Sequence, residues 1–319
     1  MSLQENYVLA LDVGGTVLKA ALTGRDNEPL HQARRPTAGT GGPDAVVAGI
    51  LDFAEELRAT GIDRFGGPPA AAGVVVPGIV DERTGTAVWS ANLGWRDVPL
   101  RRLLSERLGG VPVGVSHDVR AGGLAEGLVG AGAGHGRFLF VALGTGIAGA
   151  IGIDGRMEPG AHGGAGEIGH IVVRPGGARC GCGQYGCLET VASAAAVGRA
   201  WATAAGLPGA TAADAARAVA AGDPRAESLW RDAVDGLADG LLTGVCLLDP
   251  AVVIVGGGLA EAGETLLVPL RAALAAKATF QRIPPILPAA LGDAAGCLGA
   301  GLLAWDHCQL PTSAEVSRS

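Results

Sequence analysis

Two strand–turn–strand segments, one at the start of the chain and one near its middle, constrain the fold more than any other feature of the sequence. In each, an apolar run with strand character ends in a short glycine turn, and a second run returns from that turn. The runs are residues 7–13 and 17–23 in the first segment and residues 138–143 and 148–153 in the second. Such pairs of runs predict hairpins. Their repetition predicts duplication of one unit that cradles a nucleotide.

Helical and strand patterns alternate around both segments, which predicts an α/β protein. Strands are expected at 71–76, 79–81, 111–115 and 252–255, and helices at 45–60, 100–108, 119–129 and 294–305, with 191–248 mostly helical and broken near 206–209 and 222–224. The length of 319 residues suits two lobes with a cleft between them. We expect a smaller N-terminal lobe of residues 1–116, joined by the C-terminal helix at about 305–319, and a larger lobe of residues 117–304.

Composition excludes several classes of partner. The formal net charge of -7 comes without long basic runs, so the basic footprint of a nucleic-acid-binding protein is missing. Hydrophobic residues make up 48% of the chain, yet no apolar run reaches the roughly 18 residues that a membrane span needs. The start of the chain lacks the basic region of a signal peptide. We expect a cytoplasmic protein that binds neither nucleic acid nor membrane.

The first glycine turn has features of a phosphate-binding loop. Gly14, Gly15 and Thr16 follow Asp12 directly after the first strand. The glycines would let backbone N–H groups approach phosphate oxygens, Thr16 adds a hydroxyl, and Asp12 is suited to hold Mg²⁺ through water. No Walker A sequence is present, so a P-loop fold is not expected. A turn that only reverses the chain is the alternative.

Two further glycine turns follow strands in the second half. Gly144, Thr145 and Gly146 occupy the same place in the second segment, so two phosphate turns could face each other across a cleft. Gly256 and Gly257 follow the strand at 252–255, where a ligand such as the adenosine of ATP could lie against the backbone. A pair of structural hairpins and a tight βα turn are the alternatives.

A histidine and three cysteines form the most specific chemical signal. His170, Cys180, Cys182 and Cys187 fall within one short segment that is rich in glycine. Three thiolates and one imidazole close a tetrahedral Zn²⁺ site, and a closed site is structural because a catalytic zinc keeps a position for water. A disulfide is the alternative, but it would leave one thiol unpaired and is disfavoured in a reducing compartment.

Three carboxylates stand beside these features. Glu167 and Glu189 bracket the zinc segment, which would hold both in place to accept hydrogen bonds from sugar hydroxyls. Asp118 lies between a predicted strand and a predicted helix. It is suited either to cap the helix or to accept the proton of a hydroxyl that receives phosphate. The spacing alone does not separate these two roles.

Taken in order, the motifs resemble those of the ROK family, which joins bacterial glucokinases and related sugar kinases with sugar-responsive repressors. The resemblance rests on LDVGGT (11–16), VPGIVD (76–81), NLGW (92–95), HDVRA (117–121), LGTGIAGAI (143–151), GEIGHIVVRPGGARCGCGQYGCLE (166–189) and VIVGGG (253–258). It implies the actin-like ATPase (ribonuclease H-like) fold and transfer of phosphate from MgATP to a sugar. It also implies a homodimer.

The resemblance assigns roles by motif position. It implies that Asp118 is the catalytic base. The sugar-pocket residues would be Asn92, Glu167, His170 and Glu189; the zinc ligands His170, Cys180, Cys182 and Cys187; the phosphate turns Gly14, Gly15, Thr16, Gly144, Thr145 and Gly146; and the adenosine turn Gly256 and Gly257.

One position departs from the family pattern and bears on the sugar. Family kinases commonly have Asn before the catalytic Asp, and that Asn touches the sugar, whereas this chain has His117. We expect a glucokinase, with a kinase for another hexose, an amino sugar, a ketose or a cyclitol as the alternative. A repressor would need a helix-turn-helix domain, for which the segment before Asp12 leaves no room. A non-catalytic sugar-binding protein is the other alternative.

Overall fold

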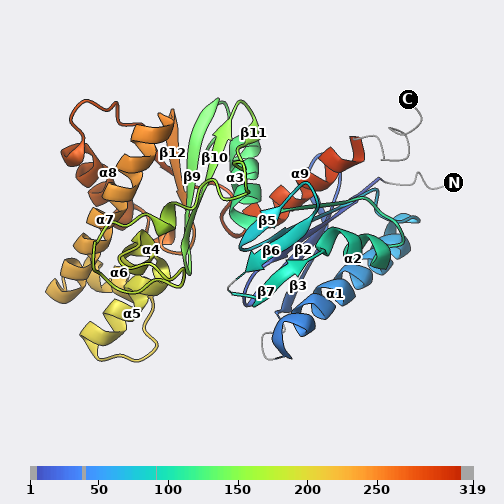
Figure 1. The fold of residues 1–319 in the computed structure, drawn as a ribbon, viewed down its shortest axis with the longest axis horizontal. Helices are drawn as coiled ribbons and strands as arrows, with labels where there is room; N and C mark the ends of the chain where they lie inside the picture. The colour runs from blue at the N-terminus through green and yellow to red at the C-terminus, as the bar shows by residue number, and fades with distance from the viewer. Residues whose placement is uncertain (1–5, 38–40, 91, 310–319) are drawn as a thin grey trace. The chain divides into compact units, whose positions relative to one another are not determined.

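A five-stranded mixed sheet organises the N-terminal part of the chain. Its strands lie in the order β3 (Pro29–Pro36), β2 (Val17–Thr23), β1 (Val8–Val13), β4 (Ala72–Val76) and β8 (Val113–His117). Figure 1 labels β2 and β3 of this sheet. This computed structural model describes residues 6–37, 41–90 and 92–309. β1 and β2 form an antiparallel hairpin, while β4 pairs in parallel with β1 and with β8. The first predicted hairpin is confirmed.

A second five-stranded sheet repeats this arrangement. Its order is β11 (Arg156–Met157), β10 (Ile147–Ile153), β9 (Arg137–Leu143), β12 (Val252–Gly256) and β13 (Ile286–Pro288). β9 and β10 form the antiparallel hairpin, and β12 lies parallel to β9 as β4 does to β1. The second predicted hairpin is confirmed, and the two sheets share the order expected of a repeated unit.

Helices cover both faces of the first sheet, and β1 shows why its sequence is almost continuously apolar. Leu9, Leu11 and Val13 pack in one core with helix α1 (Gly42–Phe65) and helix α2 (Leu100–Arg107). Val8 and Ala10, which alternate with them, pack toward helix α9 (Ala295–Gln309). A strand buried on both faces needs apolar side chains at every position. Asp12 is the exception, and it lies on the α9 side by the same alternation.

Close packing of α9 on this sheet gives a first prediction. A Cβ atom on Gly73, in β4, would lie 1.8 Å from the carbonyl oxygen of Ala300. Gly73→Ala therefore forces strand and helix apart, and we expect it to lower the free energy of unfolding by about 1–3 kcal/mol. Urea denaturation measures this change. Gly164→Ala is the matched control, because a Cβ there meets nothing within 4 Å; equal stability of the two variants would contradict the packing argument.

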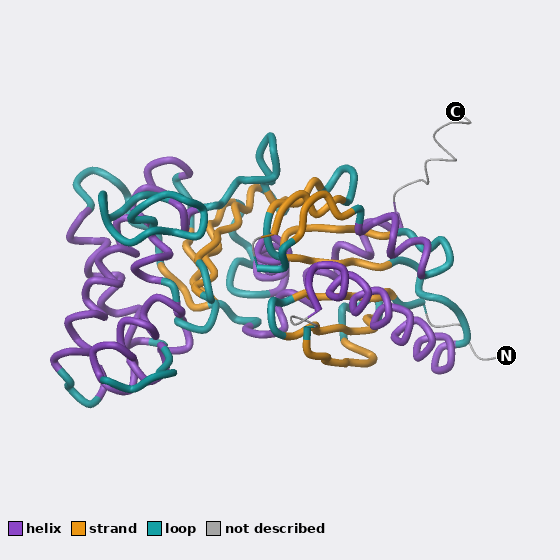
Figure 2. Tube along the Cα trace, turned by 60° about the horizontal axis from the view of Figure 1, so that its bottom comes forward, coloured by secondary structure: helices purple, strands orange, loops and turns teal. Residues whose placement is uncertain are grey.

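The helices of the second half gather on one face of the second sheet (Figures 1 and 2). They are α4 (Leu188–Ala192), α5 (Ala194–Ala205), α6 (Ala212–Ala220), α7 (Pro224–Leu248) and α8 (Glu264–Lys277). Leu139, Val141 and Leu143 of β9 share one core with them. The predicted helical stretch and its two breaks are confirmed, whereas α8 was missed. No helix in the described ranges is both long and apolar enough to span a bilayer.

A small three-stranded sheet lies ahead of α2; its first strand was predicted at 79–81, whereas its other two strands were missed. It consists of β5 (Ile79–Asp81), β6 (Thr86–Ser90) and β7 (Trp95–Val98), in that order. Helix α3 (Asp118–Val129) follows β8 directly. The strand predicted at 111–115 is shifted, because β8 pairs with β4 as far as His117. β8 therefore ends at His117, and α3 begins at the next residue, Asp118.

The chain divides into two compact units. Unit 1 contains residues 1–125, 161–163 and 294–319, and unit 2 contains residues 126–160 and 164–293. All of α9 falls in unit 1, since it packs on the first sheet, and so do the first turns of α3. The lobe boundaries at residues 116 and 304 stay a prediction. The last ten residues of the segment predicted at 305–319 lie outside the described residues.

Candidate functional site

The first glycine turn is closed by hydrogen bonds that leave its tip exposed. The Gly14 N–H donates to the Val17 carbonyl at 3.0 Å, and the Thr37 hydroxyl donates to the Gly14 carbonyl at 2.7 Å. A Cβ on Gly14 would lie 2.7 Å from the Val17 oxygen, so this position requires glycine. Gly15 and Thr16 are exposed. The turn thus presents backbone at a fixed tip, as a phosphate cradle must.

Asp12 lies just before this turn and is almost buried. Its carboxylate is 3.6 Å from the ammonium group of Lys19, the residue opposite it in the hairpin. The first turn of α9 also approaches the carboxylate of Asp12. A Cβ on Gly296, in that turn, would lie 2.4 Å from a carboxylate oxygen of Asp12. Cys297, next to Gly296 in the chain, is half-buried, and loss of solvent around its thiol together with the charge of Asp12 raises its pKa to about 12. Cys297 therefore stays a neutral thiol beside a carboxylate.

The second and third glycine turns meet at one edge of the second sheet. The Gly144 N–H donates to the Gly146 carbonyl at 3.0 Å, and the Gly144 carbonyl accepts from the first N–H of α5 at 2.9 Å. Gly257 has a φ of 83°, and a Cβ on it would lie 2.6 Å from the backbone nitrogen of Leu143. Because β9 and β12 are parallel, both turns follow carboxyl ends of strands, where α/β sheets bind ligands. Gly256 ends β12 at the same place.

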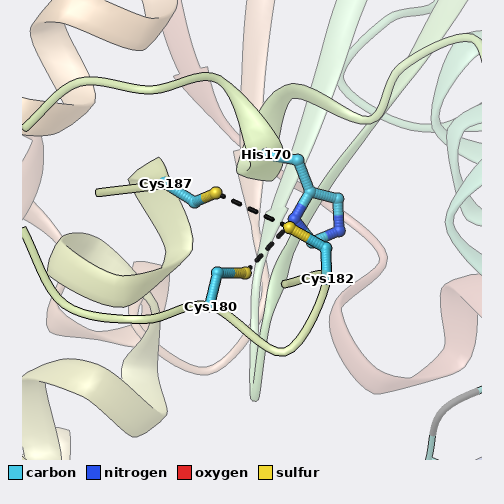
Figure 3. Close-up of side chains that lie close together, drawn as sticks. All are labelled: His170, Cys180, Cys182 and Cys187. Atoms are coloured by element: carbon cyan, nitrogen blue, oxygen red, sulfur yellow. Dashed lines mark hydrogen bonds between the residues drawn. The ribbon is translucent and has the colours of Figure 1, made fainter. Parts of the chain in front are cut away.

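The four predicted zinc ligands converge in unit 2. Figure 3 shows the side chains of His170, Cys180, Cys182 and Cys187 directed toward one another. One ligand atom from each lies within 4.8 Å of all the others. His170 ends the short 3-10 helix η2 (Ile168–His170), and Cys187 immediately precedes α4. All six cysteines of the chain are free thiols, so the disulfide alternative is not what the structure contains.

The distances within this cluster fit a zinc ion. The sulfur atoms of Cys182 and Cys187 are 3.8 Å apart, and Nδ1 of His170 is 3.5 Å from the sulfur of Cys180. Bonds of about 2.3 Å to sulfur and about 2.0 Å to nitrogen place tetrahedral ligand atoms about 3.5–3.8 Å apart. Burial raises the pKa of the Cys180 and Cys187 thiols. Metal binding at these two thiols would therefore release protons.

Both carboxylates that bracket the zinc segment contact the cluster. Oε2 of Glu167 is 3.8 Å from Nε2 of His170, the ring nitrogen directed away from the cysteines. Oε1 of Glu189 accepts from the Cys180 thiol at 2.9 Å. A Cβ on Gly146 would lie 2.8 Å from the other oxygen of Glu189, so Glu189 also reaches the second glycine turn. The structure thus brings Glu167, His170 and Glu189 together in unit 2.

His117 and Asp118 lie at the junction of β8 and α3 in unit 1. Oδ1 of Asp118 accepts from the Val119 N–H at 2.7 Å and is 3.3 Å from Nε2 of His117. The His117 side chain is 9% exposed and that of Asp118 30% exposed. His117 is therefore held within the unit while the carboxylate beside it reaches solvent. Asn92 is exposed in the turn between β6 and β7 of the same unit.

A partly buried polar network lies beside Asp118, and no sequence motif predicted it. Oε1 of Glu82 accepts hydrogen bonds from the Ser116 hydroxyl and from Nη1 of Arg120. Arg120 and Ser116 are each 5% exposed. Arg120 lies within the motif HDVRA, and Ser116 directly precedes it. Their common partner, Glu82, is 34 residues from Ser116 and 38 residues from Arg120 in the chain. The one available signal was an arginine two residues after the candidate base.

The repeated sheet with a glycine turn in each hairpin defines the class as α/β proteins of the actin-like ATPase fold. A sequence model described as the ROK family matches residues 8–307, and the chain belongs to the ROK family. A glucokinase of Halalkalibacterium halodurans is 34% identical, with 94% of this chain and 96% of that protein covered. A kanosamine kinase of Amycolatopsis mediterranei is 33% identical, with 93% and 96% covered.

A solved structure supports the same classification. The crystal structure of a ROK family glucokinase from Streptomyces griseus, in complex with glucose and AMPPNP, is 30% identical and superposes with a TM-score of 0.80. The match covers 94% of this chain and all of that one. The predicted fold class is confirmed.

Proposed function

We propose that this chain is an ATP-dependent sugar kinase that transfers the γ-phosphate of ATP to a hydroxyl of glucose. The observation that carries the proposal is the junction at Asp118, which presents a partly exposed carboxylate directly after a buried strand. Both of its described contacts use Oδ1. We assign Oδ2 to the incoming hydroxyl. The similarity to glucokinases over nearly the whole chain supports glucose as the sugar.

The reaction needs an aligned nucleophile, neutralised phosphate charge and an acceptor for one proton. In our proposal, Asp118 takes the hydroxyl proton as the sugar oxygen bonds to the γ-phosphorus. The bond from phosphorus to the β–γ bridging oxygen breaks, and ADP leaves. The exposed turn residues Gly15, Thr16 and Thr145 would bind the phosphates. Asp12 would hold Mg²⁺ through water, which suits its oxygen donors, and Mg²⁺ supplies positive charge at the phosphates.

The remaining assignments are part of the same proposal. Asn92, His117, Glu167, His170 and Glu189 bind the sugar, and Gly256 and Gly257 lie under the adenosine. The four-ligand cluster holds one structural Zn²⁺, which its ligand distances support. We further propose a cytoplasmic homodimer.

A coupled assay of ADP release tests the proposal. The panel should contain glucose, mannose, kanosamine, fructose and myo-inositol, with Asp118→Asn as the reference for background. ATP consumption that depends on one of these compounds supports a kinase. If none is consumed above the Asp118→Asn level while the sugars still bind, the chain is a sugar-binding protein and the proposal is wrong.

An amino sugar is the second candidate substrate, and the observation behind it is His117, which stands where family kinases commonly have Asn. The similarity to a kanosamine kinase, at 33% identity against 34% for a glucokinase, supports keeping an amino sugar as a candidate. His117→Asn introduces the residue associated with glucose, so we expect the ratio of kcat/KM for glucose over kanosamine to rise about tenfold, which corresponds to about 1.4 kcal/mol, the upper end of the net contribution of one hydrogen bond. His31→Asn, on β3, is the matched control. A ratio unchanged within twofold would show that His117 does not select the sugar.

A further inference from the structure

Arg120 and Glu82 hold the two ends of the segment that carries Asp118. Ser116 lies two residues before Asp118 on β8, and Arg120 lies two residues after it on α3. The same oxygen of Glu82 accepts from both side chains. Bonds between a guanidinium and a carboxylate are the strong class of hydrogen bond. One carboxylate therefore fixes the strand end and the helix start on both sides of the proposed base.

Arg120 also reaches a third segment. Its Nη2 donates to the Gly163 carbonyl at 2.8 Å. Residues 161–163 belong to unit 1, although the residues on either side of them belong to unit 2. Gly163 has a φ of 75°, and a Cβ on it would lie 2.6 Å from the Val80 carbonyl, so this backbone is closely packed in unit 1. Glu167 follows four residues later.

We propose that Arg120, with Glu82, is a positioning residue that fixes Asp118 and the segment 161–163 of unit 1 through one side chain. It touches neither reacting group. Its two nitrogens bind groups from different segments, which a lysine at this position could not reproduce, because the guanidinium offers two donors in a fixed geometry. The inference rests on the proposed kinase activity, since it concerns the placement of the base.

Turnover by Arg120 variants is the first test. Arg120→Met is expected to lower kcat about 100-fold, the cost of a displacement of about 1 Å at a reacting group, with KM for ATP changed less than threefold. Arg120→Lys should recover part of the loss, because it can bind Glu82 but not Gly163 at the same time. Arg102→Met is the matched control, because Arg102 pairs with Glu106 on the exposed face of α2. A kcat kept within threefold in Arg120→Met would overturn the proposal.

The double variant separates positioning from general damage. Because Arg120 acts through Asp118, adding Arg120→Met to Asp118→Asn should lower kcat less than threefold further. A second 100-fold loss in the double variant would mean that Arg120 acts independently of the base, and the proposal would be wrong.

Hydrogen exchange measured by mass spectrometry tests the placement without catalysis. Arg120→Met should speed exchange in peptides that cover 116–120 and 161–166 and leave 174–187 unchanged. Unchanged exchange in the first two segments would overturn the proposal even if the chain proved not to be a kinase. Absence of turnover by the unmodified protein, with exchange altered as expected, would instead count only against the proposed function.

Discussion

Asp118→Asn is expected to lower kcat by about 10²–10⁴-fold, the usual contribution of a positioned general base. The amide cannot take the proton from the sugar hydroxyl, but its oxygen can still accept from the Val119 N–H, so the start of α3 should be kept. The expected signature is a loss in kcat at nearly constant KM for sugar and ATP. Steady-state kinetics with the best sugar of the panel, together with thermal unfolding, measure both parts of this expectation.

Asp306→Asn provides the control, since Asp306 is exposed near the end of α9 and carries the same charge change. If Asp118→Asn retained more than a tenth of the turnover, Asp118 would be left with the structural role of a residue at a helix start. A loss of activity that came with a loss of folded protein would point the same way, because the substitution would then have damaged the junction.

Cys187→Ser is expected to abolish zinc binding and to destabilise the protein by about 4 kcal/mol or more, as losses of structural metal do. Cys187 is fully buried at the start of α4, and its sulfur lies beside that of Cys182. Removing this ligand opens a four-ligand site and leaves the buried thiol of Cys180 without a metal. Elemental analysis should find about one zinc per chain in the unmodified protein and none in the variant, and calorimetry should show the lower stability.

Cys246→Ser is the matched control because Cys246 is an exposed thiol on α7, outside the cluster. It should keep the zinc content and the melting temperature. The expectation fails if the unmodified protein is purified folded, active and free of metal, or if Cys187→Ser still holds a full equivalent of zinc.

The sequence predicted those parts of the protein whose residues lie close together in the chain. The two hairpins were predictable because strands buried on both faces, such as β1, must be apolar along their length. The cluster of one histidine and three cysteines was predictable because its members lie within one short segment, where His170 and Cys187 are close in sequence as well as in space.

The parts that were missed depend on weaker or more distant signals. β3 reads PLHQARRP and has few apolar residues, because it is an edge strand that is largely exposed. α8 contains Pro269 inside the helix, which hides the helical pattern. The network of Glu82, Ser116 and Arg120 joins residues far apart in the chain, so no spacing rule could have assembled it.

The segment 161–163 has a consequence for how this protein can be divided. Residues 161–163 and α9 belong to unit 1 but follow residues of unit 2 in the chain. The chain therefore passes from one unit to the other at four points, after residues 125, 160, 163 and 293. No single cut therefore yields both units intact. A fragment that ends before α9 would expose the face of β1 formed by Val8 and Ala10. A fragment of residues 126–293 would carry Gly163 without the arginine that binds it. Expression of either half alone is thus expected to give an insoluble product, whereas co-expression of the two fragments offers a route to reassembly.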